Sequence, residues 1–196
     1  MSIRPAISTS IAQPKLEGAG VHLHRAFGFQ EPQKHDPFLL FDDFRNEFPE
    51  SYEAGFPWHP HRGIETITYV LTGSVDHKDS LGNSGTLGAG DVQWMTAGSG
   101  IMHQEMPTGN LQGQMHGFQL WANLPGSIKM TSPRYQDVKG KEIPEITDDD
   151  GTIVRVITGK FWGQHGPVDG IAADPLYLDI CVPAGQFKRF KVATLF

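Results

Sequence analysis

Two short stretches of the sequence carry paired side chains that could bind a metal ion. His59 and His61 stand two residues apart, and so do His103 and Glu105. Side chains at i and i+2 of a β-strand leave the same face, so each pair can direct two ligand atoms at one point. Imidazole nitrogens and carboxylate oxygens bind transition metals at about 2.0–2.2 Å. Two such pairs on facing strands predict a site of three histidines and one carboxylate.

The residues alone leave the identity of the carboxylate open. Glu105 shares the expected face of His103. Glu65 has the same parity as His59 and His61, so an unbroken strand would point it toward the same interior. The alternative for Glu65 is a structural carboxylate that binds Arg62 or backbone amides.

The other histidines lack a paired context of this kind. A lone histidine is more often a structural or exposed residue than a ligand, and the His22-x-His24 pair has no second pair to accompany it. We therefore expect structural or exposed positions for a set of five: His22, His24, His35, His77 and His165. His116 is a candidate for the wall of a pocket.

The predicted ligand set narrows the choice of metal without deciding it. Three imidazoles and one carboxylate suit Fe, Mn, Co, Ni, Cu or Zn, and the Irving–Williams order means that affinity alone does not select one. Four protein ligands in an octahedral field leave two positions open for a chelating substrate or O2. A structural zinc site would instead close tetrahedrally.

The elements that must position these residues are strands. Several segments are rich in β-branched, aromatic and other apolar residues, and glycine-rich or proline-rich turns separate them. The clearest expected strands cover residues 65–72, 91–95, 116–121 and 152–158. No window shows the apolar spacing of an amphipathic helix. The pattern predicts an all-β sandwich or barrel.

Composition excludes several classes of protein. The chain has 196 residues, a formal net charge of −6 and one cysteine. This cysteine content excludes a disulfide framework and a multi-cysteine zinc site. The acidic balance argues against direct binding to nucleic acid. No apolar run is long enough to cross a membrane, and no secretory signal is expected at the N-terminus, so we expect a cytoplasmic protein.

The chain is expected to divide into two parts. Residues 139–151 are polar, become acidic toward the end and contain a proline, which is typical of a linker or surface loop. Residues 1–138 form the first predicted domain. Residues 152–196 offer about three strands, which rarely make an independent barrel.

Longer motifs in this sequence resemble those of the pirin family. His59-Pro-His61 followed by Glu65 and Gly73 is similar to the first motif of the cupin superfamily. Two segments resemble pirin motifs most closely: Gly90-Asp-Val-Gln-Trp-Met-Thr-Ala-Gly-Ser-Gly-Ile-Met-His-Gln-Glu105 and His116-Gly-Phe-Gln-Leu-Trp-Ala-Asn-Leu-Pro125. A third matching segment, Phe38-Leu-Leu-Phe-Asp-Asp-Phe44, precedes them in the chain. The resemblance covers about residues 15–190.

The resemblance implies a bicupin architecture of jelly-roll-like β-barrels, with a single metal in the N-terminal barrel at 1–138. The stretch Pro175-Leu-Tyr-Leu-Asp-Ile-Cys-Val-Pro-Ala-Gly185 is similar to the opening of the C-terminal cupin, which then breaks off. We therefore expect an incomplete second barrel within 152–196.

The resemblance also implies a ligand set and a metal. In pirins the carboxylate ligand is the glutamate two residues after the histidine of the second motif, which is Glu105 here. The implied ligands are His59, His61, His103 and Glu105, and the implied metal is Fe(II), although another divalent transition metal is possible. Glu65 would then contact the metal ligands without binding the metal itself, or it would hold the adjacent turn.

Two functions follow from the resemblance. The first is a quercetin 2,3-dioxygenase-like oxidoreductase, in which Glu105 acts as general base on a flavonol-like aromatic and O2 opens the ring with loss of carbon monoxide. Its pocket walls would be hydrophobic, with these candidates: Phe56, Trp58, Trp94, Met95, Met106 and Phe118. For each of these side chains taken singly, a place in the barrel core is the favoured alternative. The alternative is a non-catalytic regulatory protein whose metal tunes binding to a protein partner.

Overall fold

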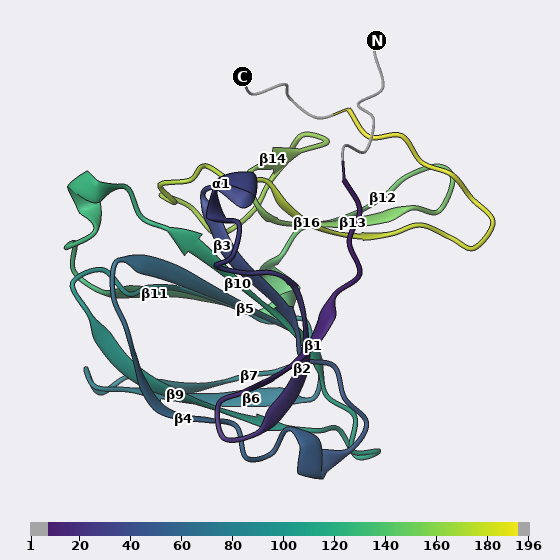
Figure 1. The fold of residues 1–196 in the computed structure, drawn as a ribbon. Coiled ribbons are helices and arrows are strands. Elements are labelled where there is room, and N and C mark those ends of the chain that lie inside the picture. The colour runs from purple at the N-terminus through teal and green to yellow at the C-terminus, as the bar shows by residue number, and fades with distance from the viewer. Residues whose placement is uncertain (1–7, 192–196) are drawn as a thin grey trace. The chain divides into compact units, whose positions relative to one another are not determined.

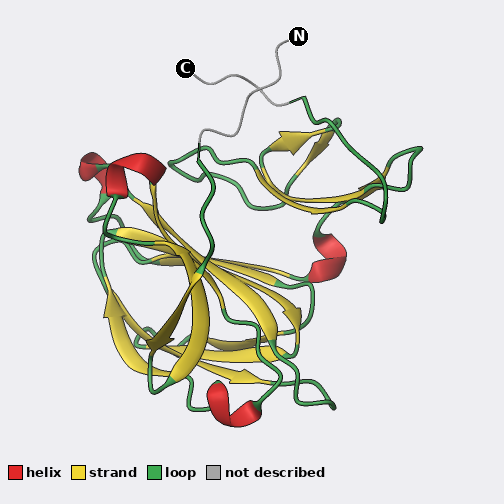
Figure 2. Cartoon of the chain, turned by 45° about the vertical axis from the view of Figure 1, so that its right-hand side comes forward, coloured by secondary structure: helices red, strands yellow, loops and turns green. Residues whose placement is uncertain are grey.

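Nearly all regular structure in the chain is β-strand, as the sequence pattern predicts. The computed structural model describes residues 8–191, and the helical elements within this range are single short turns (Figure 2). They are α1 (Pro32–His35) and the 3-10 turns η1 (Pro49–Ser51), η2 (Gly126–Ile128) and η3 (Gly140–Glu142). The all-β prediction is confirmed. The chain separates into two units, residues 1–140 and 141–196.

Unit 1 contains two antiparallel sheets. The larger has seven strands in the spatial order β1 (Gln13–Glu17), β2 (Val21–Phe27), β3 (Phe38–Asp43), β10 (His116–Asn123), β5 (Ile64–Thr72), β8 (Val92–Thr96) and β11 (Arg134–Val138). The smaller has four, in the order β4 (Phe56–His61), β9 (Ile101–Thr108), β6 (Ser74–Asp79) and β7 (Ser84–Leu87). In Figure 1 the smaller sheet faces the larger one across the interior of the unit. No hydrogen-bonded strand pair of the described residues joins the two sheets into a closed barrel.

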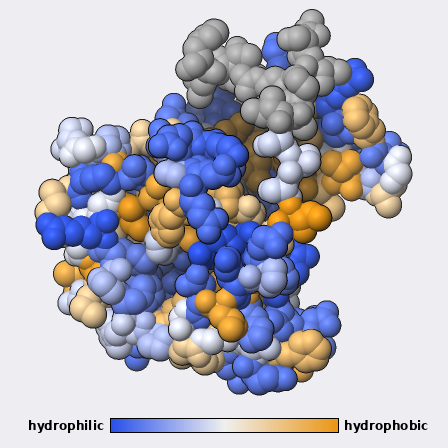
Figure 3. Space-filling model, in the orientation of Figure 1, coloured by the Kyte–Doolittle hydropathy of each residue, from blue (hydrophilic) through white to orange (hydrophobic). Residues whose placement is uncertain are grey.

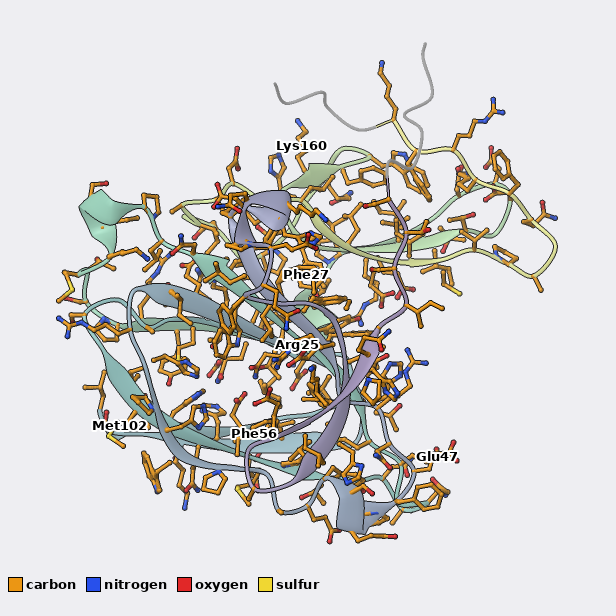
Figure 4. All side chains as sticks on the ribbon, viewed as in Figure 1. Arg25, Phe27, Glu47, Phe56, Met102 and Lys160 are labelled. Carbon is orange, nitrogen blue, oxygen red and sulfur yellow. The ribbon has the colours of Figure 1, made fainter. Side chains whose placement is uncertain are left out.

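Side chains alternate between the two faces of each strand, and burial shows which face is inside. Along β9, Ile101, His103 and Glu105 are buried, whereas Met102 is exposed and appears on the outer side of the smaller sheet in Figure 4. The inner face therefore carries the odd-numbered residues of β9. On β5, Thr68 contacts Glu105, so the even-numbered residues of that strand face the interior.

Two glycine turns lie next to each other where the chain leaves the smaller sheet and returns to it. Gly63 joins β4 to β5, and Gly98 lies between β8 and β9; both have positive φ, at 70° and 52°. The Gly63 amide donates a 2.8 Å hydrogen bond to the Gly98 carbonyl. A Cβ at Gly98 would lie 2.1 Å from the Thr131 carbonyl oxygen, so only glycine fits there.

Apolar side chains from both sheets form two buried clusters in unit 1. One buried cluster consists of Val21, Leu23, Phe44, Tyr52, Val70, Val75, Leu87 and Met115. A smaller cluster consists of Met95, Ala97 and Ile101. Hydrophilic residues dominate the face seen in Figure 3, with hydrophobic ones scattered among them.

Unit 2 is a smaller β-structure. Its three-stranded antiparallel sheet has the order β12 (Glu145–Thr147), β13 (Ile153–Thr158) and β16 (Tyr177–Cys181), and a hairpin pairs β14 (Lys160–Phe161) with β15 (Gln164–His165). Val154, Val156 and Phe161 form its buried core. The strand β12 lies within residues 139–151, which the sequence presented as a linker. The limits 1–138, 139–151 and 152–196 remain our proposal for the domains.

Candidate metal centre

Three histidines converge on the inner face of the smaller sheet. One ligand atom from each of His59, His61 and His103 lies within 4.8 Å of the others. The Nε2 atoms of His59 and His61 are 3.0 Å apart. The rings of His59 and His103 are closest, with centroids 4.4 Å apart. The sequence placed these three residues together, and the structure does the same.

Strand pairing explains this convergence. In the antiparallel register of β4 and β9, His59 is directly opposite His103, and His61 is opposite Ile101. Cross-strand neighbours on one face have Cβ atoms about 4.5–5.5 Å apart. The register shifts between Phe56 and His59, which shows an irregularity in β4 just before the histidine pair.

The chemistry of the three rings suits a metal ion. His59 Nδ1 lies 2.8 Å from the Pro57 carbonyl oxygen and donates to it, which leaves the lone pair on Nε2. Burial lowers the pKa of His61 to about 3 and also lowers the pKa of His103, so both rings are neutral near pH 7. Both ring nitrogens of His103 are buried and lack a hydrogen-bond partner among residues 8–191. Neutral imidazoles with available lone pairs are the form that binds transition metals.

Glu105 completes the polar cluster. Its Oε2 lies 3.8 Å from His103 Nε2. Thr68 on β5 donates a 3.0 Å hydrogen bond to Oε1, and the Gln119 amide on β10 donates to Oε2 at 3.0 Å. Burial raises the pKa of Glu105, but nearby His103 and the donors Gln119 and Thr68 outweigh it, so the pKa is lowered. The side chain is held as a carboxylate next to the histidines.

Glu65 lies elsewhere. It is buried and accepts a 2.7 Å hydrogen bond from the Thr96 hydroxyl across the β5–β8 pair. It stands three residues from Thr68, which faces the interior, so Glu65 points to the opposite face of the larger sheet. The parity argument for Glu65 was wrong because β4 and β5 belong to different sheets, separated by the Gly63 turn. Among residues 8–191 its side-chain hydrogen-bond partner is Thr96, rather than Arg62 or a backbone amide.

A cavity of about 500 Å³ opens beside the cluster. His59, His61 and Glu105 contribute to its lining. The rest of the lining includes Glu17, Arg25, Phe29, Leu40, Asp42, Phe56, Trp58, Gln119 and Trp121. Figure 4 labels two of these residues, Arg25 and Phe56, in the region between the sheets. The Arg25 guanidinium makes two 2.8 Å hydrogen bonds to the Asp42 carboxylate and a 2.9 Å ion pair with Glu17.

Two of the six candidate wall residues line the cavity. Phe56 and Trp58 line the cavity, whereas Met95 is in the apolar core of the interior. Trp94 and Phe118 point to the opposite face of the larger sheet, because each is next in sequence to an inward residue, Gln93 or Gln119.

The remaining candidates also fall outside the cavity. Met106 lies on the outer face of β9, between the inward residues Glu105 and Pro107. His116 is not part of the lining either, and its Nε2 is 3.9 Å from Asp43 Oδ1. His22, His24 and His165 are exposed, His35 is half-buried, and His77 is buried with its ring stacked near Tyr135.

Sequence reasoning missed Thr68, Gln119 and Trp121, which approach the cluster from the larger sheet. Gln119 and Trp121 stand at i and i+2 on one strand, the same spacing that identified the histidines. That spacing could have placed the two on one face. It could not show that this face meets Glu105.

Two facing antiparallel sheets with a three-histidine cluster on the inner face define a cupin fold. The match to solved structures agrees: a quercetin 2,3-dioxygenase from Acinetobacter baumannii superposes with a TM-score of 0.73, with 37% identity over 82% of this chain and 59% of that one. The pirin family model matches residues 20–122. A pirin-like protein of Caulobacter vibrioides is 48% identical over 186 residues, 94% of this chain and 67% of the relative. The chain belongs to the pirin family.

Two further comparisons concern the metal site and the length of this chain relative to similar proteins. A bacterial pirin from Escherichia coli, solved in complex with nickel(II), matches with a TM-score of 0.53 and 25% identity over 74% of this chain and 67% of that one. This relative binds a transition metal. The chain spans between 49% and 67% of the length of the curated relatives that it matches. Among the described residues, no helix has the length and apolar character needed to cross a membrane.

Proposed function

We propose that this chain is an iron-dependent dioxygenase that opens a flavonol-type ring with O2. One observation carries the proposal: the rings of His59, His61 and His103 and the carboxylate of Glu105 stand together beside a cavity of about 500 Å³. Cavities that bind small molecules have volumes of roughly 300–1,000 Å³ and combine apolar walls with a few convergent polar groups. The similarity to a solved quercetin 2,3-dioxygenase supports the choice of substrate class.

The proposed ligands are His59, His61, His103 and Glu105, and the proposed metal is Fe(II). The donor set of three imidazoles and one carboxylate also suits other divalent transition metals, and the nickel complex of a relative shows one. Bound Fe(II) would supply Lewis-acid polarisation of a substrate hydroxyl and redox chemistry toward O2.

The residues of the chain then have distinct tasks. Glu105 takes the proton of the flavonol 3-hydroxyl as general base, a role for which its lowered pKa keeps it ionised. Thr68 and Gln119 hold that carboxylate from the larger sheet. The overall reaction adds both atoms of O2, opens the ring and releases carbon monoxide.

The cavity walls suit a flat aromatic substrate. Five side chains contribute apolar surface to the lining: Phe29, Leu40, Phe56, Trp58 and Trp121. Aromatic rings stack on such walls with centroids about 4.5–7 Å apart.

A regulatory role is the competing proposal. The Caulobacter relative is named a pirin-like protein, and this name states no enzymatic activity. With a net charge of −6, direct contact with nucleic acid is disfavoured, so regulation would pass through a protein partner. We propose a cytoplasmic location for either role.

Turnover of quercetin under O2 separates the two proposals. Protein loaded with Fe(II) should consume quercetin and release carbon monoxide, and a chelator should abolish both until Fe(II) is restored. The matched control is the Glu105→Gln variant, whose turnover should fall by about 10²–10⁴-fold, as is typical when a general base is lost. Iron-loaded wild-type protein that leaves quercetin unchanged would contradict the dioxygenase proposal and favour the regulatory one.

A further inference from the structure

Gln119 lies between two side chains that together determine its orientation. Its Oε1 accepts a 2.8 Å hydrogen bond from the indole Nε1–H of Trp121. Its Nε2 donates to both carboxylate oxygens of Glu105, at 3.2 and 3.0 Å. An indole N–H can only donate, so the amide oxygen of Gln119 must face Trp121 and the NH2 group must face Glu105. The amide therefore cannot turn over without losing hydrogen bonds at both ends.

This orientation limits the movement of Glu105. The Thr68 hydroxyl donates to Oε1 at 3.0 Å, so the carboxylate receives donors from two strands of the larger sheet. Glu105 itself comes from β9 of the smaller sheet. The carboxylate is thus held across the interior by Thr68 and Gln119, with Oε2 3.8 Å from His103 Nε2.

Trp121 also contacts the other side of the cluster and the cavity. Its ring meets His61 edge-on, with centroids 4.9 Å apart and an interplanar angle of 83°. Trp121, Gln119 and Glu105 all contribute to the lining of the cavity. A molecule that binds in the cavity and stacks on Trp121 would therefore contact the residue that orients Gln119.

We propose that Gln119 is the positioning residue of Glu105, and that Trp121 sets the orientation of Gln119 and so links the cavity to the metal ligands. This inference rests on the proposed metal centre with Glu105 among its ligands. Hydrogen-bond partners of metal ligands typically change metal affinity by about 10–100-fold when they are removed. Gln119 acts through Glu105 and touches no metal itself.

Two variants test the chain of contacts with Co(II) alone as the probe. Gln119→Met keeps the length of the side chain but removes its donors, and Trp121→Phe keeps an aromatic ring but removes the indole donor. We expect Gln119→Met to weaken Co(II) binding by about 10–100-fold. Trp121→Phe should weaken it less, and both variants should shift the visible absorption spectrum of bound Co(II), which reports ligand geometry.

Trp94→Phe is the matched control. Trp94 is fully buried on the opposite face of the larger sheet, so its replacement costs packing without touching Gln119. The control should lose thermal stability yet keep the wild-type Co(II) spectrum and affinity. Folded Gln119→Met and Trp121→Phe proteins that both keep the wild-type spectrum and affinity would overturn the positioning role. Wild-type protein that binds no Co(II) would overturn the metal centre itself, and the positioning role with it.

Discussion

One member of the histidine cluster, His103, brings unpaired polar atoms into the interior. His103 is 1% exposed, and neither ring nitrogen has a hydrogen-bond partner among residues 8–191. A buried polar atom without a partner costs roughly 1–3 kcal/mol. A metal ion bonded to one of these two nitrogens would offset part of that cost, which is why the arrangement favours a binding role over a structural one.

Replacing one ring tests this cluster directly. We expect His61→Ala to abolish metal binding while the fold survives, because apolar clusters from both sheets hold the unit together independently of this residue. Elemental analysis and circular dichroism check the two halves of the prediction. His22→Ala, which changes an exposed histidine on β2, is the control and should keep the metal. Loss of the folded signal when the metal is stripped from wild-type protein would contradict this view.

Substitution of the two buried glutamates, Glu105 and Glu65, should affect different properties of the protein: metal affinity for the first and stability for the second. Glu105→Gln should weaken metal affinity by about 10-fold or more, taking the effect of outer partners as a lower guide. Glu65→Gln should leave the metal in place, because Glu65 faces Thr96 on the other side of the sheet. Its cost should be in the free energy of unfolding, about 1–3 kcal/mol. Metal content and denaturant unfolding should be measured for both variants. If Glu65→Gln loses its metal while Glu105→Gln keeps it, the carboxylate ligand is Glu65 and not Glu105.

The sequence predicted the cluster because all its members obey a local rule. His59 with His61, and His103 with Glu105, are pairs at i and i+2, and strand geometry alone puts each pair on one face. Thr68 and Gln119 obey no such rule with respect to Glu105. They reach it from another sheet, and Gln119 follows it by 14 positions in the chain. Contacts of this kind depend on how the sheets face each other, which residue spacing does not encode.

At the scale of elements, the strands were predictable but their faces were not. β5 is rich in β-branched residues and β10 carries the aromatic residues Phe118 and Trp121, so the existence of both strands follows from propensity. Both faces of these strands contain buried residues, because Ile67 and Thr68 are each at most 2% exposed. Without a polar face, the alternation of hydrophobicity cannot show which side meets the cavity. The sequence therefore left open whether Phe118 and Trp94 line the cavity or pack elsewhere.

One carboxylate joins the ends of two neighbouring strands in the larger sheet. Asp91, just before β8, accepts hydrogen bonds from Lys139 Nζ at 2.8 Å and from the Gly140 amide at 2.7 Å, both just after β11. The Gly88 amide donates a third, at 3.0 Å. Burial raises the pKa of Asp91, but Lys139 and the two amides outweigh it, so the pKa in the folded protein is lowered. The carboxylate therefore stabilises the fold in its charged form.

The stability from Asp91 should depend on pH in a defined direction. Because the folded pKa lies below the unfolded value of about 3.9, the contribution is complete above about pH 5 and is lost as pH falls through the folded pKa. Asp91→Asn should therefore lower the free energy of unfolding by about 1–2 kcal/mol at pH 7, and by less near pH 3. Guanidinium unfolding at both pH values measures the difference. Asp149→Asn, at an exposed aspartate, is the control, and a deficit of Asp91→Asn that grows toward low pH would contradict the argument.

At the scale of the whole molecule, the site and its supports lie within one unit. The four proposed ligands, together with Thr68, Gln119 and Trp121, all fall in residues 1–140. Both sheets of the cupin fold and both apolar clusters between them are also contained there. Unit 2 has its own small core around Val154, Val156 and Phe161. The sequence indicated such a division through the polar run at 139–151, although that run contributes β12 to the second unit.

The division predicts that residues 1–140 suffice for metal binding. No side chain that we assign to the metal or to the support of Glu105 comes from residues 141–196, so removing them should leave the geometry of the cluster unchanged. We expect the 1–140 fragment to fold and to bind Co(II) with the same visible spectrum as the full chain, and with an affinity within about 10-fold, a difference of about 1.4 kcal/mol. Circular dichroism and a Co(II) titration of both proteins test this, with His61→Ala in the fragment as the control that should not bind. A fragment that fails to fold, or that folds and does not bind Co(II) while the full chain does, would show that the two units form one structural whole on which the site depends.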